Sequence, residues 1–144
     1  MPSRAPRFRR ALLVVPLSHD GQSVLLRKPD ERRAWRPLQW PVPAGHTEVK
    51  ALRQWRRLHS TLPAMSRGSV TGRMSMPAET EIHLYTIVIL RLMAPVQATS
   101  LTRSGSWHPI ARLAETRVFP ADLPLLIEGY VYGWLPDGPI TLDH

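Results

Sequence analysis

A group of cations follows a proline and glycine turn in the segment Trp40–Leu62, "WPVPAGHTEVKALRQWRRLHSTL". After Glu48, every charged side chain of the helix predicted here is basic: Lys50, Arg53, Arg56 and Arg57. The planar guanidinium group of arginine matches the geometry of phosphate oxygens, whereas a hard divalent cation requires several carboxylate oxygens. The spacing of Lys50, Arg53 and Arg57 places them on one face of a helix, and we expect this face to bind an anion.

The predicted ligand site also includes three residues outside this face, Arg36, Trp40 and Gly45. Arg36 adds to a positive field to which four other arginines contribute, namely Arg9, Arg10, Arg32 and Arg33. Trp40 has a ring that can stack on a nucleobase, and Gly45 forms the turn that leads into the helix. The alternative is an ordinary solvated helix face with Trp40 packed against the turn, and the sequence leaves both interpretations open.

The acidic residues near the turn are candidates for catalysis or metal binding. Glu48 is the candidate catalytic residue. The candidate metal ligands are Glu48, Glu79 and Glu81, with His46, His59 and His83 as further donors. Such a cluster suits Zn²⁺ or Mn²⁺, but the neighbouring cations make capture of a metal costly, so no metal site is assigned. The alternative role of Glu48 is a favourable charge at the start of a helix, and that of Glu79 and Glu81 is solvation of a turn and a strand edge.

Composition favours one soluble domain with an uneven charge distribution. The chain has 144 residues, no cysteine and a formal net charge of +8, to which 17 arginines contribute. From Val118 onward there is no Lys or Arg and the charge is −4, so the preceding part carries +12. This asymmetry favours a polyanionic partner, although arginine also accumulates where any solvated cation suffices. The absence of a signal peptide pattern or a long apolar run predicts a cytoplasmic protein without a membrane segment.

The hydrophobic pattern predicts strands, one helix, further strands and a closing helix. Residues 1–7 are expected to be a flexible basic arm, residues 8–135 one domain, and residues 136–144 a C-terminal tail. Strands are predicted at 8–17, 23–27, 38–42, 69–76 and 81–93, and helices at 48–60, 108–115 (brief) and 121–135. The first helix is predicted to bury Ala51, Leu52, Trp55, Leu58 and Leu62. The last is too apolar for one buried stripe, so some of its apolar residues, among them Tyr130, Tyr132 and Trp134, are candidates for contact with a protein partner or a second copy. The alternative is a broad core face closed by the "LPDG" turn, with Tyr130 and Trp134 on the buried side.

The order of these elements and several of their residues resemble the Nudix hydrolase superfamily. The matching pieces are "RALLVVPL", "SVLLRK", "WPVPAGHTEV", "KALRQWRRLHSTL", "EIHLYTIVILRLMAP", "SWHPIARLAE" and "RVFPADLPLLIEGYVYGWL". Together they span Phe8 to Leu135. The resemblance implies an α/β/α sandwich around a mixed β-sheet, in which a glycine turn and a helix form the Nudix box. The glutamates of that box hold Mg²⁺ or Mn²⁺ against a diphosphate, where the metal activates a water.

This chain departs from the Nudix box residue by residue. One register leaves Gln54 at the arginine position of the box, and Trp55, Leu58 and His59 at its three helix glutamates. An alignment without gaps that starts at Gly45 instead places Ala51, His59 and Ser60 at positions where the box has glutamate or arginine. In both registers the acidic metal site is lost, and only Glu48, just after the turn, matches an acid of the family.

Three hypotheses about function follow. The first is a Nudix-like protein that has lost metal-dependent hydrolysis, needs no cofactor, and binds an anionic ligand such as a nucleotide, a nucleic acid or an acidic partner. The second is a divergent Nudix pyrophosphohydrolase that cleaves nucleoside diphosphate-linked substrates with Mg²⁺ or Mn²⁺, using Glu48 with Glu79, Glu81 or a histidine. The third is a protein-interaction or assembly subunit without a small ligand.

Overall fold

The computed structural model describes residues 7–29, 34–96 and 105–143. Residues 1–6 of the predicted arm lie outside this range, as do Arg32 and Arg33. The strands are β1 (Arg7–Leu17), β2 (Ser23–Arg27), β3 (Leu38–Val42), β4 (Met65–Pro77), β5 (Glu81–Leu92), β6 (Gly105–Pro109) and β7 (Gly138–Thr141). The helices are α1 (Glu48–Leu58), the 3₁₀ helix η1 (Ile110–Glu115) and α3 (Leu123–Val131).

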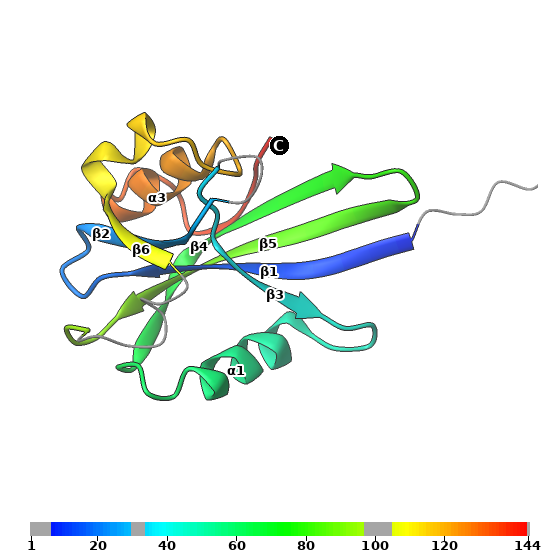
Figure 1. The fold of residues 1–144 in the computed structure, drawn as a ribbon, viewed down its shortest axis with the longest axis horizontal. Helices are drawn as coiled ribbons and strands as arrows, with labels where there is room; N and C mark the ends of the chain where they lie inside the picture. Colours follow the sequence, from blue (N-terminus) through cyan, green and yellow to red (C-terminus); the bar gives the residue numbers. More distant parts are fainter. Residues whose placement is uncertain (1–6, 30–33, 97–104, 144) are drawn as a thin grey trace, which may run out of the picture.

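The strands of the described residues form one mixed sheet in the order β6-β2-β1-β5-β4-β7, and β3 also pairs with β1. β1 is central: β2 and β3 pair with different parts of one edge, and β5 runs parallel to it along the other. β4 pairs antiparallel with β5, and β7 pairs parallel with β4. The predicted mixed sheet is therefore confirmed (Figure 1).

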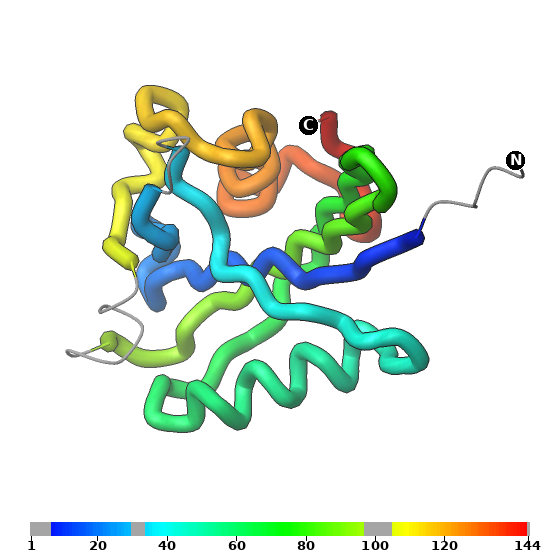
Figure 2. Tube along the Cα trace, turned by 45° about the vertical axis from the view of Figure 1, so that its right-hand side comes forward, coloured from blue at the N-terminus to red at the C-terminus, as the bar shows by residue number. Residues whose placement is uncertain are grey.

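The sheet lies between two helical layers, with α1 on one side and α3 and η1 on the other (Figures 1 and 2). Side chains alternate between the two faces of a strand, so neighbouring residues of β1 enter different cores. Leu12 and Val14 pack in the core under α1, whereas Leu13 and Val15 pack in the core under α3. Both faces of β1 are therefore buried from Ala11 to Leu17, and the expected α/β/α sandwich is confirmed.

Helix α1 begins where the sequence predicts. Thr47 is the N-cap, and its Oγ1 accepts a hydrogen bond from the backbone N–H of Lys50 at 3.1 Å. Leu58 was expected to be buried, but its side chain is 66% exposed. The helix ends at this residue, and the ring of His59 instead stacks on Trp55, with 4.3 Å between ring centroids.

The C-terminal segment differs from the prediction in two respects. α3 ends at Val131 rather than Leu135, because Gly133 adopts a φ of +74° that ends the helix and leaves Tyr132 and Trp134 exposed. The segment predicted as a tail contains β7, which adds an edge strand to the sheet beside β4. No helix in the described ranges is long and apolar enough to cross a membrane.

Candidate functional site

Glu48 lies at the start of α1 and reaches the centre of the sheet. Thr86 on β5 donates a hydrogen bond from its Oγ1 to the Glu48 Oε1 at 2.7 Å. The Arg73 Nη1 atom on β4 lies 3.7 Å from the same carboxylate oxygen. Thr86 is only 5% exposed, so its hydroxyl needs this partner. Glu48 therefore serves the packing of α1 on the sheet.

A cavity of about 400 Å³ opens beside Glu48 on the same side of the sheet. We name it the α1-side cavity; its lining residues are Arg10, Glu48, Arg73, Met74, Ser75, Leu84, Tyr85, Thr86 and Thr141. Arg10 donates from Nη2 to the backbone carbonyl of His46 at 2.6 Å. Among the described residues, the charged side chains that line this cavity are two guanidinium groups and one carboxylate, so their formal charge is positive.

The donor set around Glu48 does not fit a divalent cation. Mg²⁺ requires several oxygen ligands, and Glu48 offers one carboxylate next to two guanidinium groups. The other two candidate acids lie elsewhere: Glu79 lines a different cavity, and Glu81 binds Arg9. Among the residues that the structure describes, no group of three or more His, Asp or Glu side chains could hold a metal ion.

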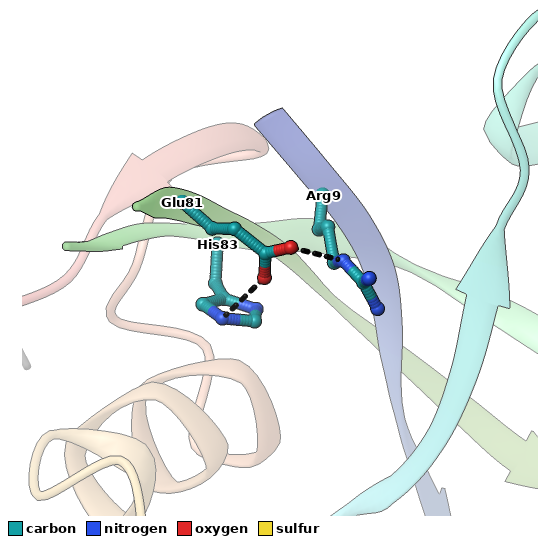
Figure 3. A network of polar contacts seen from close by, with 3 residues as sticks. All are labelled: Arg9, Glu81 and His83. Atoms are coloured by element: carbon teal, nitrogen blue, oxygen red, sulfur yellow. Dashed lines mark hydrogen bonds and ion pairs between the residues drawn. The ribbon is translucent and has the colours of Figure 1, made fainter. Parts of the chain in front are cut away.

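Glu81 takes part in a small polar network at the start of β5 (Figure 3). Its Oε1 accepts a hydrogen bond from Arg9 Nε at 2.8 Å, and its Oε2 lies 3.7 Å from His83 Nε2. Arg9 and His83 are both accessible to solvent, and they lie on β1 and β5. This network therefore links the first residues of the two strands at the surface.

Trp55, Leu58 and His59, which one alignment places at glutamate positions of the Nudix box, differ in their exposure to solvent. Trp55 is 2% exposed and fills the core between α1 and the sheet. His59 is bonded through Nδ1 to the Trp55 carbonyl at 2.8 Å, and Leu58 faces solvent. The indole ring of Trp55 therefore stabilises the fold by apolar burial.

The predicted cationic face exists. Lys50, Arg53 and Arg57 line a shallow groove of about 220 Å³ on the outer side of α1, together with Thr47, Val49 and Gln54. Lys50, Arg53 and Arg57 are all exposed. The structure therefore brings these three predicted residues together, and we name them the α1 cationic stripe.

The other predicted ligand residues lie apart from the stripe. Trp40 packs against the core under α1, where its Nε1 is buried without a hydrogen-bond partner in the described residues. Gly45 holds the turn before α1 with a φ of +80°, which requires glycine. Arg36 lies on the opposite side of the sheet, with its guanidinium carbon 4.5 Å from the ring centroid of Phe119.

Arg36 belongs to a second cavity, which we name the α3-side cavity. Its volume is about 490 Å³, and its lining residues are Arg36, Met76, Pro77, Ala78, Glu79, His83, Tyr85 and Phe119. The rings of His83 and Tyr85 stack at 6.0 Å with an angle of 11°, and Phe119 meets Tyr85 edge-on at 6.4 Å. This cavity therefore combines aromatic surface with a guanidinium group, an imidazole group and the Glu79 carboxylate.

The sequence pointed to some of the residues that line the two cavities, namely Arg36, Glu48, Glu79 and His83, but not to the others. Arg73 and Thr86 were not considered, and Arg10 was counted only in a general positive field. Their positions on strands could have revealed them, because residues two apart on a strand point to the same face of the sheet. Arg10 therefore shares a face with Leu12, which packs under α1. The contribution of Phe119 had no such signal, since it comes from the loop before α3.

A comparison of the sequence with protein-family models and with curated proteins finds no match. Solved structures do match. A C. elegans Ap4A hydrolase has a TM-score of 0.67 and 14% identity over 89% of this chain and 99% of its own. The MutT protein of methicillin-resistant Staphylococcus aureus 252, described as a Nudix hydrolase, has a TM-score of 0.66 and 18% identity over 90% and 99% of the two chains. An E. coli dihydroneopterin triphosphate pyrophosphohydrolase has a TM-score of 0.59 and 15% identity over 88% and 99%. The chain therefore has the Nudix fold.

Proposed function

We propose that this protein binds a phosphate-bearing ligand with an aromatic ring, such as a nucleotide, and does not hydrolyse it with a divalent metal. The observation that carries the proposal is the α3-side cavity, where the rings of Phe119 and His83 lie over the buried Tyr85, beside the Arg36 guanidinium and with Glu79 at the wall. Aromatic faces stack on bases of any kind, and a guanidinium group suits phosphate oxygens. A volume of about 490 Å³ is in the range of small-molecule sites.

The names of proteins with the same fold agree with this ligand class. One is named for Ap4A and another for dihydroneopterin triphosphate. From the names of these proteins we infer only the class of ligand for the present chain. The chemistry differs because Trp55 fills the helix core and Glu48 is bonded to Thr86 beside Arg73.

A binding and activity experiment tests the proposal. We expect AMP to bind the wild-type chain, and Phe119→Leu to weaken it about five- to hundredfold, because one ring–base contact is worth about 1–3 kcal/mol. Leucine keeps apolar volume at this position but has no aromatic face. Isothermal titration measures the affinity, and Leu125→Ala on the exposed side of α3 is the control that should leave it unchanged.

The same preparation is assayed for hydrolysis of nucleoside diphosphate-linked compounds and dinucleoside polyphosphates with Mg²⁺ and with Mn²⁺, by chromatographic separation of the nucleotide products. No metal-dependent turnover is expected. Turnover that Glu48→Gln abolishes would show that the protein is a divergent hydrolase and would overturn the proposed loss of catalysis.

A second candidate function, nucleic-acid binding, is favoured by the α1 cationic stripe. Its three cations lie exposed along one side of a helix, where a phosphate backbone can contact them in sequence. The logarithm of the binding constant falls linearly with the logarithm of the salt concentration, and each phosphate contact to single-stranded DNA contributes about 0.7 to the slope. We expect a triple variant with Lys50→Gln, Arg53→Gln and Arg57→Gln to have a slope smaller by about two. Fluorescence anisotropy over a series of salt concentrations measures the slope.

The matched control replaces three exposed arginines elsewhere, Arg27, Arg67 and Arg112, by glutamine and makes the same change in net charge. If both triple variants lose the same amount of this slope, total charge alone attracts the DNA, and the α1 cationic stripe has no specific role.

A further inference from the structure

The α1-side cavity lies over two rows of side chains that cross the sheet. Strand register places Arg10, Leu84 and Ser75 in one row on β1, β5 and β4. The next row runs Leu12, Thr86, Arg73 and Thr141, from β1 to β7. Directly paired residues point to the same face of a sheet, which here is the face that α1 covers. α1 begins at Glu48, above Thr86, so the row of Arg10 extends beyond the helix.

We propose that the α1-side cavity is a second ligand site, which takes a small phosphorylated molecule that carries hydroxyl groups and no aromatic ring. This site is separate from the nucleotide site proposed above, because the two cavities lie on opposite faces of the sheet. Only Tyr85 lines both of them.

Two guanidinium groups provide the contacts for the phosphate. Arg10 uses one N–H to bind the His46 carbonyl, and a guanidinium has five N–H donors in all, so further donors face other directions. Arg73 is 3.7 Å from Glu48 Oε1, a long ion pair, and its side chain is 55% exposed. Glu48 is the one acid among the described residues of the lining, so these residues together carry a formal charge of +1, which favours an anion.

The remaining polar groups suit hydroxyls. Ser75 and Thr141 each offer a hydroxyl group that donates and accepts, and Glu48 accepts. Thr86 already bonds Glu48 at 2.7 Å and holds the carboxylate at the wall of the cavity. Leu84 supplies the apolar surface on which carbon atoms of the ligand can lie.

An aromatic ligand has no stacking partner here. Tyr85 lines the cavity, but its ring contacts His83 and Phe119 on the α3 side and packs in the core under α3. The polar groups of the lining are therefore guanidinium, hydroxyl and carboxylate groups, which suit a phosphate and the hydroxyls of a ligand. A volume of about 400 Å³ accommodates a molecule of the size of a sugar phosphate.

Isothermal titration with glucose 6-phosphate, inorganic phosphate and glucose tests this site on the full chain. We expect saturable binding of glucose 6-phosphate at one site, and a loss of about ten- to hundredfold in Arg73→Ala, because a hydrogen bond to a charged group is worth about 1.5–3 kcal/mol. Ser75→Ala should weaken glucose 6-phosphate but leave inorganic phosphate unchanged. Amide chemical shifts of Thr86 and Thr141 should move on binding.

Two controls separate this site from the rest of the molecule. Arg112→Ala removes an exposed arginine of η1 and should leave the affinity unchanged, as should Phe119→Leu, which addresses the nucleotide site. Arg73→Lys keeps the charge without the planar fork, and should bind more weakly than wild type while melting at the same temperature.

Three results would overturn the inference. One is the absence of saturable binding of glucose 6-phosphate. Another is equal affinity for inorganic phosphate and glucose 6-phosphate with no effect of Ser75→Ala. This result would show that the cavity binds the anion and does not recognise the sugar. The last is a loss of glucose 6-phosphate binding in Phe119→Leu but not in Arg73→Ala, which would place the sugar phosphate in the α3-side cavity. AMP binding measured in the same variants reports on the proposed function separately.

Discussion

Trp55→Ala is expected to lower the free energy of unfolding by about 3–5 kcal/mol, the range found for truncation of large buried aromatic residues. Trp55 is 2% exposed and packs against residues of β1, β3 and β5 under α1. Truncation removes the apolar contacts of the indole and leaves a cavity that the sheet cannot fill by moving. Chemical denaturation followed by circular dichroism measures the change.

Leu58→Ala is the matched control for Trp55, because it truncates an apolar residue of the same helix that is 66% exposed. Its expected effect is within about 0.5 kcal/mol. An unchanged denaturation midpoint in Trp55→Ala would contradict the buried role of the indole, and would reopen this helix face for a ligand or a metal.

Leu126→Ala is expected to destabilise the opposite layer by about 2–5 kcal/mol. Leu126 is 1% exposed and lies in the core under α3. It packs so closely on β4 that a Cβ atom added at Gly72 would lie 2.9 Å from Leu126 Cδ2. The leucine side chain therefore occupies space that the glycine leaves free, and its loss should loosen α3 from the sheet.

Leu125→Ala is the control on the adjacent position of α3, where the side chain is 57% exposed. Denaturation of the double variant Trp55→Ala with Leu126→Ala adds a further check. The two residues belong to separate cores on opposite faces of the sheet, so their effects should add within about 0.5 kcal/mol. A strong departure from additivity would mean that the sheet transmits strain between the two layers.

Much of the fold could be predicted because local signals agree with the tertiary arrangement. Thr47 and Glu48 mark the start of α1 correctly, and the apolar runs of β1 and β5 reflect burial on both faces. β7 was missed because "GPIT" is short and begins with glycine and proline, so only pairing with β4 makes it a strand.

The candidate site could be predicted only in part. The α1 cationic stripe follows from helical spacing, which is local information. The separation of Arg36 from that stripe depends on which face of the sheet each element covers, and no local pattern encodes that choice. The two cavities join residues of four or more segments, including Phe119 and Thr141, whose neighbours are set by the assembled sheet.

The parallel pairing of β1 with β5 has a consequence for how the chain acquires its structure. β1 gains its longest partner only when residues 81–92 are available, and until then β2 and β3 alone can cover it. A contact between segments so distant along the chain requires closure of a long loop, which slows the search for the native state. During synthesis the apolar β1 therefore stays without β5 until residue 92 has been produced, and in this interval its unpaired edge and apolar side chains can contact other chains.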